Sequence, residues 1–210
     1  GTSLATIVFT SLSSVRAHHR RGAVRWRLFA RITPGIVVGA LLGSVVADWL
    51  PSGYLKIVFG VFELSVATQM ALAARPSPHR QLPGRAGMSG AGSVIGAVSA
   101  VVGIGGGTMT VPFLAWCNVP MREAVATSAA VGLPIAVAGA VGFAANGWDQ
   151  AGLPAGSLGY ISLPALGGVA FASVLFAPVG ARLAHSLPAA SLKRVFAVFL
   201  ALLGLRMLLS

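Results

Sequence analysis

The chain has 210 residues, of which 56% are hydrophobic and only 9% are charged. A soluble domain carries about a quarter charged residues, so this composition excludes a water-soluble globular protein and predicts an integral membrane protein. The net charge of +11 does not indicate nucleic-acid binding, because the basic residues fall between apolar segments, where they orient a membrane protein. The single cysteine, Cys117, excludes an intramolecular disulfide and a cysteine-cluster metal site.

The apolar segments predict an all-α fold, a polytopic bundle of transmembrane helices. The chain opens on an apolar segment without a signal-peptide pattern, and we expect a further piece upstream of it. Two basic loops, residues 16–27 and 75–85, interrupt the apolar sequence. In chain order, the predicted spans are residues 1–15, 28–50, 53–74, 124–145, 158–179 and 195–209.

The positions of Lys and Arg predict the orientation of a multi-pass protein of the inner membrane. With loops 16–27 and 75–85 in the cytoplasm, every Lys and Arg except Lys56 and Arg206 falls on the cytoplasmic side. Both flanks of the apolar segment 88–117 then lie on that side. Its first part, 88–102, would rise only about 22 Å, short of a crossing of about 30 Å. We therefore predict a re-entrant hairpin over 88–117, broken by glycines.

An internal duplication is visible in two places. Residues 50–62 (LPSGYLKIVFGVF) match 187–199 (LPAASLKRVFAVF) at an offset of 137, and Gly1-Thr2-Ser3 resembles Ala126-Thr127-Ser128 at an offset of 125. A strongly basic loop follows the first Thr-Ser span, and a loop without basic residues follows the second, so the copies face opposite ways. Such inverted repeats are common in secondary transporters.

The duplication divides the chain into three parts. We expect a first repeat over 1–74, a basic cytoplasmic linker over 75–87 and a second repeat over 88–210. The second repeat would hold the hairpin 88–117 and three further spans.

The glycine-rich sequence VGIGGGTMTVP, residues 102–112, is the strongest candidate for a binding site. Unwound backbone inside a membrane is tolerated where it lines a cavity, and a helix that begins near Thr108 would direct free N–H groups at an anion. Thr127 and Ser128 on the following span could add hydroxyl donors. Alternatively, the glycines only allow close helix packing, as we expect for Gly35, Gly39 and Gly43, whose spacing of four residues implies no ligand.

Glu63 is the one acidic residue well inside a predicted span. Intramembrane carboxylates are costly and often functional, so a proton-coupling role is one interpretation. Partial hydration or a hydrogen bond to a neighbouring helix is the alternative, and the duplicate has Leu200 at this position. No catalytic set and no metal-ligand set accompanies it; His18 and His19 are expected to be solvated loop residues. We predict no enzyme activity and no cofactor.

Residues 103–134, GIGGGTMTVPFLAWCNVPMREAVATSAAVGLP, resemble the signature hairpin and following helix of the TauE/SafE sulfite exporter family. The glycine run, the Val-Pro pair after it and the Ala-Thr-Ser triplet carry the resemblance. It implies a duplicated inner-membrane protein that moves sulfite, sulfoacetate or related sulfur-containing or organic anions. The substrate site that it implies comprises Gly103, Gly105, Gly106, Gly107, Thr108, Pro112, Thr127 and Ser128, with Thr2 and Ser3 as symmetry mates.

Together, these features predict a secondary transporter that exports or exchanges small anions by alternating access. Its expected partners are the anion and the lipid bilayer, with no nucleic acid; a homo-oligomer is left open. The alternative is a non-transporting membrane scaffold or assembly subunit held together by glycine-packed helices. The sequence leaves open which anion moves, in which direction and with which coupling ion.

Overall fold

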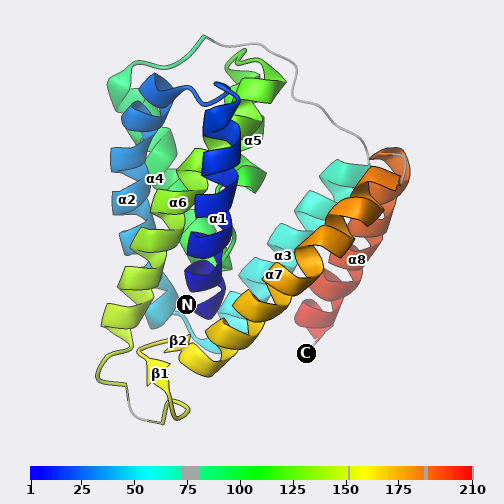
Figure 1. Ribbon diagram of the computed structural model, residues 1–210. Helices are drawn as coiled ribbons and strands as arrows, with labels where there is room; N and C mark the ends of the chain where they lie inside the picture. The colour runs from blue at the N-terminus through cyan, green and yellow to red at the C-terminus, as the bar shows by residue number, and fades with distance from the viewer. Residues whose placement is uncertain (72–80, 151, 187–188, 210) are drawn as a thin grey trace. The chain divides into compact units, whose positions relative to one another are not determined.

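The computed structural model describes residues 1–71, 81–150, 152–186 and 189–209. Within them the chain forms eight helices and one short β-hairpin (Figure 1), so the predicted all-α fold class is confirmed. The helices are α1 (Thr2–Arg20), α2 (Trp26–Trp49), α3 (Ser52–Ala71), α4 (Arg85–Val102), α5 (Gly107–Trp116), α6 (Met121–Asn146), α7 (Leu163–Ser186) and α8 (Ala189–Leu209). Of these, α2, α4 and α6 are long and apolar enough to cross a membrane along their described lengths.

The hairpin between α6 and α7 pairs two antiparallel strands, β1 (Ser157–Leu158) and β2 (Ile161–Ser162). Next to it, the Tyr160 hydroxyl donates a 2.6 Å hydrogen bond to the Asp48 carboxylate. This bond, with smaller contributions from burial and from the Asp48 charge, raises the pKa of Tyr160 above its ordinary value. The bond ties the hairpin to the end of α2.

The first basic loop is shorter than the sequence predicts, because α1 continues through Arg20. Its last turn contains His18, His19 and Arg20, and the cationic Arg20 at this helix C-terminus interacts favourably with the helix dipole. His19 also accepts a hydrogen bond at Nδ1 from the Trp26 indole N–H at 3.3 Å. Thus His18 and His19 are helical residues, which corrects their assignment to the loop.

The chain folds as two compact units, and each contains helices from both predicted repeats. The first unit comprises Gly1–Trp49 and Pro76–Gly168, and the second comprises Leu50–Arg75 and Val169–Ser210. The first therefore holds α1, α2, α4, α5, α6 and the β-hairpin, whereas the second holds α3, most of α7 and α8. The candidate glycine motif lies wholly in the first unit.

In the first unit, α2 and α4 pack backbone against backbone through glycines. A Cβ on Gly43 would lie 2.5 Å from the Ala97 carbonyl oxygen, and a Cβ on Gly35 or Gly39 would overlap carbonyl groups of α4. From the other side, a Cβ on Gly92 would lie 2.5 Å from a carbonyl oxygen of α2. The interpretation of the α2 glycines as a close-packing face is confirmed.

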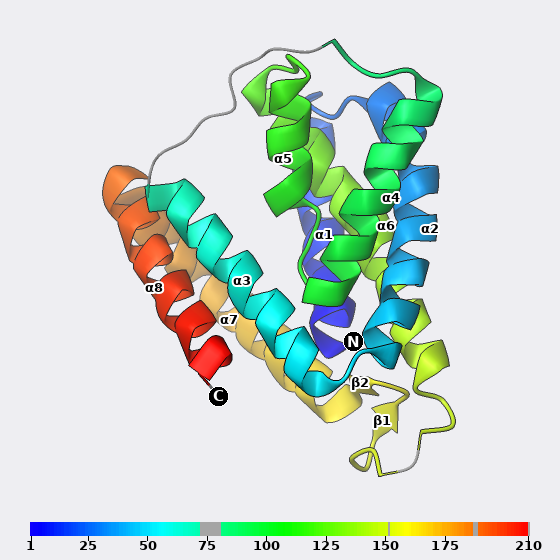
Figure 2. The ribbon, with the colours of Figure 1, turned by 180° about the vertical axis from the view of Figure 1, so that it is seen from behind.

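Helix α6 forms the centre of the first unit, in contact with α1, α2 and α5. Figure 2 shows α4 and α5 in front of the face of α6 that is hidden in Figure 1. Apolar side chains from five helices fill the interior, where van der Waals packing between the helices stabilises them. The largest are Leu4, Ile32, Ile36, Met88, Leu114, Val131 and Ile135.

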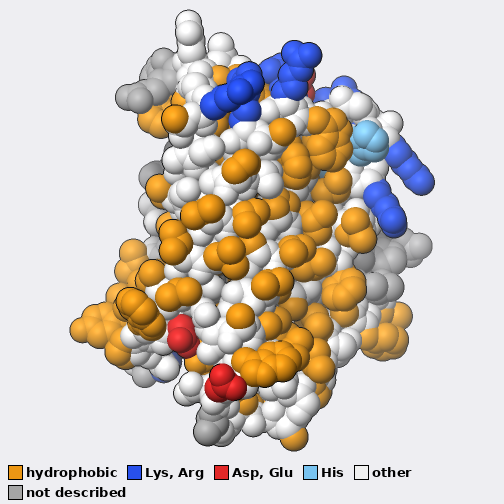
Figure 3. Space-filling view, turned by 90° about the vertical axis from the view of Figure 1, so that its left-hand side faces the viewer, with side chains coloured by type: hydrophobic (Ala, Val, Ile, Leu, Met, Phe, Trp, Pro, Cys, Tyr) orange, Lys and Arg blue, Asp and Glu red, His pale blue; other side chains and the backbone are white. Residues whose placement is uncertain are grey.

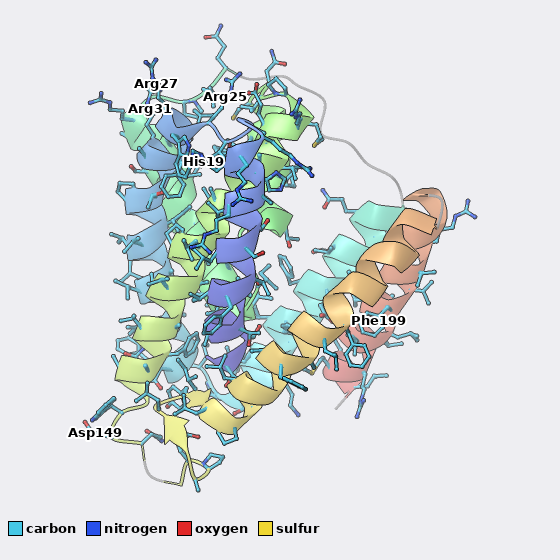
Figure 4. All side chains as sticks on the ribbon, viewed as in Figure 1. His19, Arg25, Arg27, Arg31, Asp149 and Phe199 are labelled. Atoms are coloured by element: carbon cyan, nitrogen blue, oxygen red, sulfur yellow. The ribbon has the colours of Figure 1, made fainter. Side chains whose placement is uncertain are left out.

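Charge is segregated along the first unit. On the face shown in Figure 3, Lys and Arg gather mainly at one end, and acidic side chains lie near the other. Figure 4 shows Arg25, Arg27 and Arg31 at one end and Asp149 at the opposite end. At the basic end, Arg25 forms an ion pair with Glu123, which joins the start of α2 to the start of α6.

In the second unit, α3 and α8 run antiparallel (Figure 1) and pack through small residues. A Cβ on Gly60 would lie 2.9 Å from the Gly204 carbonyl oxygen, and a Cβ on Gly204 would lie 2.9 Å from the Gly60 carbonyl oxygen. At the repeat offset of 137, Gly60 corresponds to Ala197 and Gly204 to Ala67, and both alanines are also buried. Equivalent positions of the two copies therefore carry small buried residues.

Candidate functional site

The backbone reverses at the glycine run, as the sequence predicts. Helix α4 ends at Val102, and Gly103 adopts a left-handed conformation with φ +74° and ψ 27°. Glycine takes up this conformation without a steric penalty, and it commonly ends helices in this way. The Ile104 N–H then bonds the Ser99 carbonyl oxygen at 3.0 Å. Three residues after Ile104, at Gly107, the chain enters α5.

Both outer ends of this hairpin lie at the basic end of the first unit. At the start of α4, the Ser89 hydroxyl donates a 3.3 Å hydrogen bond to the Arg31 carbonyl oxygen. Beyond α5, Glu123 pairs with Arg25. Helix α5 has 10 residues, a rise of about 15 Å. Helix α4 begins at Arg85 and has 18 residues, a rise of about 27 Å, so it is longer than predicted. The placement of the hairpin in the bilayer stays a prediction.

The three consecutive glycines have different surroundings. A Cβ on Gly106 would lie 3.0 Å from Ile135 Cδ1 and 3.1 Å from the Gly132 nitrogen, so this glycine allows close contact with α6. A Cβ on Gly105 would meet only an ordinary contact of 3.5 Å, with Ile7. Beside Gly107, the nearest atom would be the Ser128 Oγ at 3.8 Å. The packing alternative accounts for Gly106, but Gly107 has room around it.

The start of α5 presents backbone donors. The hydrogen bond from the Thr110 N–H to the Gly106 carbonyl oxygen, at 3.0 Å, closes the first turn. The amide groups of Gly107, Thr108 and Met109 precede that turn and have no carbonyl partner inside the helix. Gly107 is exposed and Thr108 is half-buried. These amides lie at the positive end of the helix dipole.

Ser128 places a hydroxyl beside these donors. Its side chain is 1% exposed, and its Oγ has no hydrogen-bond partner among the described residues. The same is true of Thr110, which is completely buried on α5. A buried hydroxyl without a partner costs about 1–3 kcal/mol, so a ligand that accepts a hydrogen bond from it would relieve that cost.

Thr127 and Thr2 have backbone partners instead. The Thr127 Oγ1 accepts a 3.0 Å hydrogen bond from the Arg25 N–H, and the Thr2 Oγ1 accepts one of 3.0 Å from the Ser162 N–H. Arg25 directly precedes α2, and Ser162 directly precedes α7. The two threonines differ by the repeat offset of 125, and the two donors differ by 137. Thr127, in the second predicted repeat, therefore holds the start of α2, and Thr2, in the first, holds the start of α7.

Two more predicted site residues are Ser3, on α1, and Pro112, on α5. The Ser3 hydroxyl donates a 2.8 Å hydrogen bond to the Gly103 carbonyl oxygen, which brings α1 to the hairpin. Pro112 lies inside α5, three residues beyond the last of the N-terminal donors, Met109. The structure thus places Ser3 beside Gly103 and Ser128 beside Gly107 of the glycine hairpin.

Three further residues beside the hairpin were not predicted from the sequence. Thr110 is one; the others are Gly132 of α6 and Ser11 of α1, whose Oγ lies 3.2 Å from where a Cβ on Gly132 would be. Gly132 lies four residues after Ser128, a spacing that places both on one helix face. This spacing could have identified Gly132, but no sequence pattern links Ser11 to it.

Glu63 belongs to the second unit, on α3 beside Gly204 of α8. Its side chain is 8% exposed, and its Oε2 has no hydrogen-bond partner among the described residues. Proton coupling stays a prediction. Within the described ranges, no group of three or more His, Cys, Asp and Glu side chains could hold a metal ion.

Comparison with known proteins gives a family for this arrangement. The family model described as sulfite exporter TauE/SafE matches residues 1–207. A probable membrane transporter protein of Haemophilus influenzae is 32% identical over the whole chain, which covers 80% of that protein. Another from Methanocaldococcus jannaschii is 26% identical, with 78% of its length covered. No solved structure matches. The chain therefore belongs to the sulfite exporter TauE/SafE family, a family of membrane transporters.

Proposed function

We propose that this membrane transporter carries small oxyanions, with sulfite, sulfoacetate and related sulfur-containing or organic anions as its substrates. In this proposal the anion binds at the N-terminus of α5, against Ser128. The observation that supports it is the buried, unpartnered Ser128 hydroxyl beside Gly107. The amides of a helix start and a hydroxyl donor would then meet one ligand.

The chemistry of these groups fits an oxyanion. The several oxygen atoms of an oxyanion can accept hydrogen bonds from the Gly107 and Thr108 amides and from the Ser128 hydroxyl at the same time. The helix dipole places roughly half a positive charge at this point. An anion could therefore lose water without an arginine in the membrane. The absence of a side chain at Gly107 leaves room for the ligand to reach the backbone.

Two features of the units support an inverted repeat, on which alternating access is proposed to depend. The corresponding helices α1 and α6 run in opposite directions within the first unit, as do α3 and α8 within the second (Figure 1). The Thr2–Ser162 and Thr127–Arg25 hydrogen bonds are reciprocal between the repeats. We propose that one repeat moves against the other. We also propose that the protein lies in the inner membrane, with the basic end of the first unit on the cytoplasmic side.

Flux of labelled sulfite into proteoliposomes tests the proposal. We expect saturable uptake that Gly107→Val abolishes, because its side chain would occupy the space beside Ser128. Gly53→Val is the matched control, since Gly53 also lies in the first turn of a helix and has no atom within 4 Å of its Cβ position. Gly106→Leu is less suitable, because contacts with Ile135 and Gly132 would disturb folding.

Two results would contradict different parts of the proposal. If sulfite, thiosulfate and sulfoacetate all fail to move in folded protein, the sulfur-anion class is wrong. If Gly107→Val transports like the parent protein, transport stands and the α5 site is wrong.

A further inference from the structure

A cleft of about 620 Å³ lies between the starts of α2 and α4, at the basic end of the first unit. Its lining comprises Arg27, Ala30, Arg31, Pro34, Arg85 and Ser89. Arg27 and Arg31 are labelled in Figure 4 on the first turns of α2. The cleft lies at the outer end of α4, away from the glycine run, and the transport proposal does not use it.

Helix packing brings the three arginines together. Arg27 and Arg31 are four residues apart, so they lie on one face of α2, and Arg85 is the first residue of α4. A Cβ on Gly35 would overlap the Ser89 carbonyl group, so the two helix starts cannot separate without breaking this contact. The 3.3 Å hydrogen bond from the Ser89 hydroxyl to the Arg31 carbonyl oxygen joins them directly.

These three positive charges have no acidic partner. Among the described residues the ion pair of Arg25 and Glu123 is the only one. Of the other carboxylates, Asp48 binds Tyr160 beside the β-hairpin, Asp149 lies at the opposite end (Figure 4), and Glu63 belongs to the second unit. Both α2 and α4 also direct their positive N-terminal ends toward the cleft. The concentration of positive charge favours a bound anion.

The position of the cleft along α2 indicates a lipid as the source of that anion. Trp26 and Trp49 flank α2 and are 43% and 81% exposed, as expected for side chains at the two membrane interfaces. Arg27 and Arg31 follow Trp26 within the first two turns of α2 and would lie at headgroup depth. Further along the same face of α2, Val38 and Leu42 are 53% and 58% exposed. A ligand with a phosphate at the arginines and an acyl chain along Val38 and Leu42 matches this arrangement.

We propose that this cleft binds the phosphate of an anionic phospholipid, with Arg27, Arg31 and Arg85 as its ligands and the acyl chains along Val38 and Leu42. Basic pockets between transmembrane helices bind anionic headgroups in this way. Ser89 contributes by holding the two helix starts together. The bound lipid joins α2 and α4 at their cytoplasmic ends.

Thermal unfolding in an uncharged detergent tests the site. Phosphatidylglycerol is titrated into the parent protein, into Arg27→Gln/Arg31→Gln/Arg85→Gln and into the control Arg16→Gln/Arg20→Gln/Arg21→Gln. The control removes the same charge from exposed arginines at the same end. Each arginine contributes about 1 kcal/mol to such binding. We therefore expect the cleft variant to bind roughly a hundredfold more weakly and the control to bind like the parent protein.

Three outcomes would overturn the proposal. If both triple variants lose the same affinity for phosphatidylglycerol, the lipid is attracted by the net charge of the protein alone. Equal stabilisation by phosphatidylcholine, whose phosphate charge is balanced by its choline group, would show binding that does not depend on the net negative charge of the lipid. Equal stabilisation by inorganic phosphate would show a site for the free anion. If the triple variant does not fold, Arg85→Gln alone replaces it, with a roughly fivefold weaker affinity expected.

Discussion

Thr127 and Ser128 are neighbours on α6 with different surroundings. The Thr127 hydroxyl accepts a backbone hydrogen bond from Arg25, whereas the Ser128 hydroxyl is buried without a partner. Successive residues on a helix point about 100° apart, so one faces the start of α2 and the other the glycine hairpin. Their roles should therefore separate in mutants.

We expect Ser128→Ala to raise the KM for the transported anion about tenfold, because a hydrogen bond to a charged group contributes roughly 1.5–3 kcal/mol. The Tm should stay the same or rise, since the substitution removes a buried hydroxyl without a partner. Flux and thermal unfolding are measured together. Ser93→Ala, whose hydroxyl binds the Ser89 carbonyl oxygen within α4, is the control. An unchanged KM in Ser128→Ala would remove this residue from the site.

Thr127→Val should behave in the opposite way. It keeps the shape of the side chain but leaves the Arg25 N–H without its acceptor, at a cost of about 1–3 kcal/mol. We expect a lower Tm and an unchanged KM. Thr2→Val should give the same result through Ser162. A raised KM with an unchanged Tm would show that these threonines bind the substrate directly.

Glu63 allows a test of coupling. If its carboxyl group carries a proton, Glu63→Gln should abolish anion accumulation driven by a pH gradient and leave anion exchange intact. Asp149→Asn, which removes an exposed carboxylate, is the control. Accumulation is measured in proteoliposomes with and without a pH gradient. Normal coupling in Glu63→Gln would leave this carboxyl group a structural role only.

At the scale of elements, glycine spacing determines how α2 and α4 meet. Gly39 is buried against α4, whereas Gly90 on α4 has no atom within 4 Å of its Cβ position. We expect Gly39→Leu to prevent folding or lower the Tm strongly, because overpacking costs typically 1–3 kcal/mol or more. Gly90→Leu should be tolerated. Size-exclusion profiles and thermal unfolding measure both, and equal behaviour would contradict the packing described here.

The glycine hairpin shows how far an element can be predicted from sequence. The break after Val102 was predicted correctly, because only glycine readily adopts the left-handed conformation of Gly103. The start of α4 was not predicted correctly. It begins at Arg85, three residues before the predicted apolar segment, because a helix can include charged residues at its end when they reach the membrane surface.

At the scale of the whole molecule, the segregation of charge predicts which end of the first unit faces the cytoplasm. In a Cys117→Ala background, Asp149→Cys should react with a membrane-impermeant thiol reagent added outside the cell. Arg21→Cys should react only after the membrane is opened, because the basic end is expected to face the cytoplasm. Both positions are exposed. The reverse labelling pattern would invert the proposed orientation.

The sequence by itself determined the properties that depend on local composition and spacing. These are an all-helical membrane fold, the break at the glycine run and the glycine face of α2, whereas the duplication of the chain stays a prediction. Each follows from side-chain size or polarity at a regular spacing, which needs no knowledge of distant contacts.

Only the tertiary structure decided which groups meet. It divided the repeats between two compact units, gave Thr2 and Thr127 reciprocal backbone partners and placed Ser128 beside Gly107. It also brought Arg85 to Arg27 and Arg31. The physical reason is that the rotation of a helix about its axis is set by the helices packed against it. That rotation decides which of two adjacent side chains faces the site.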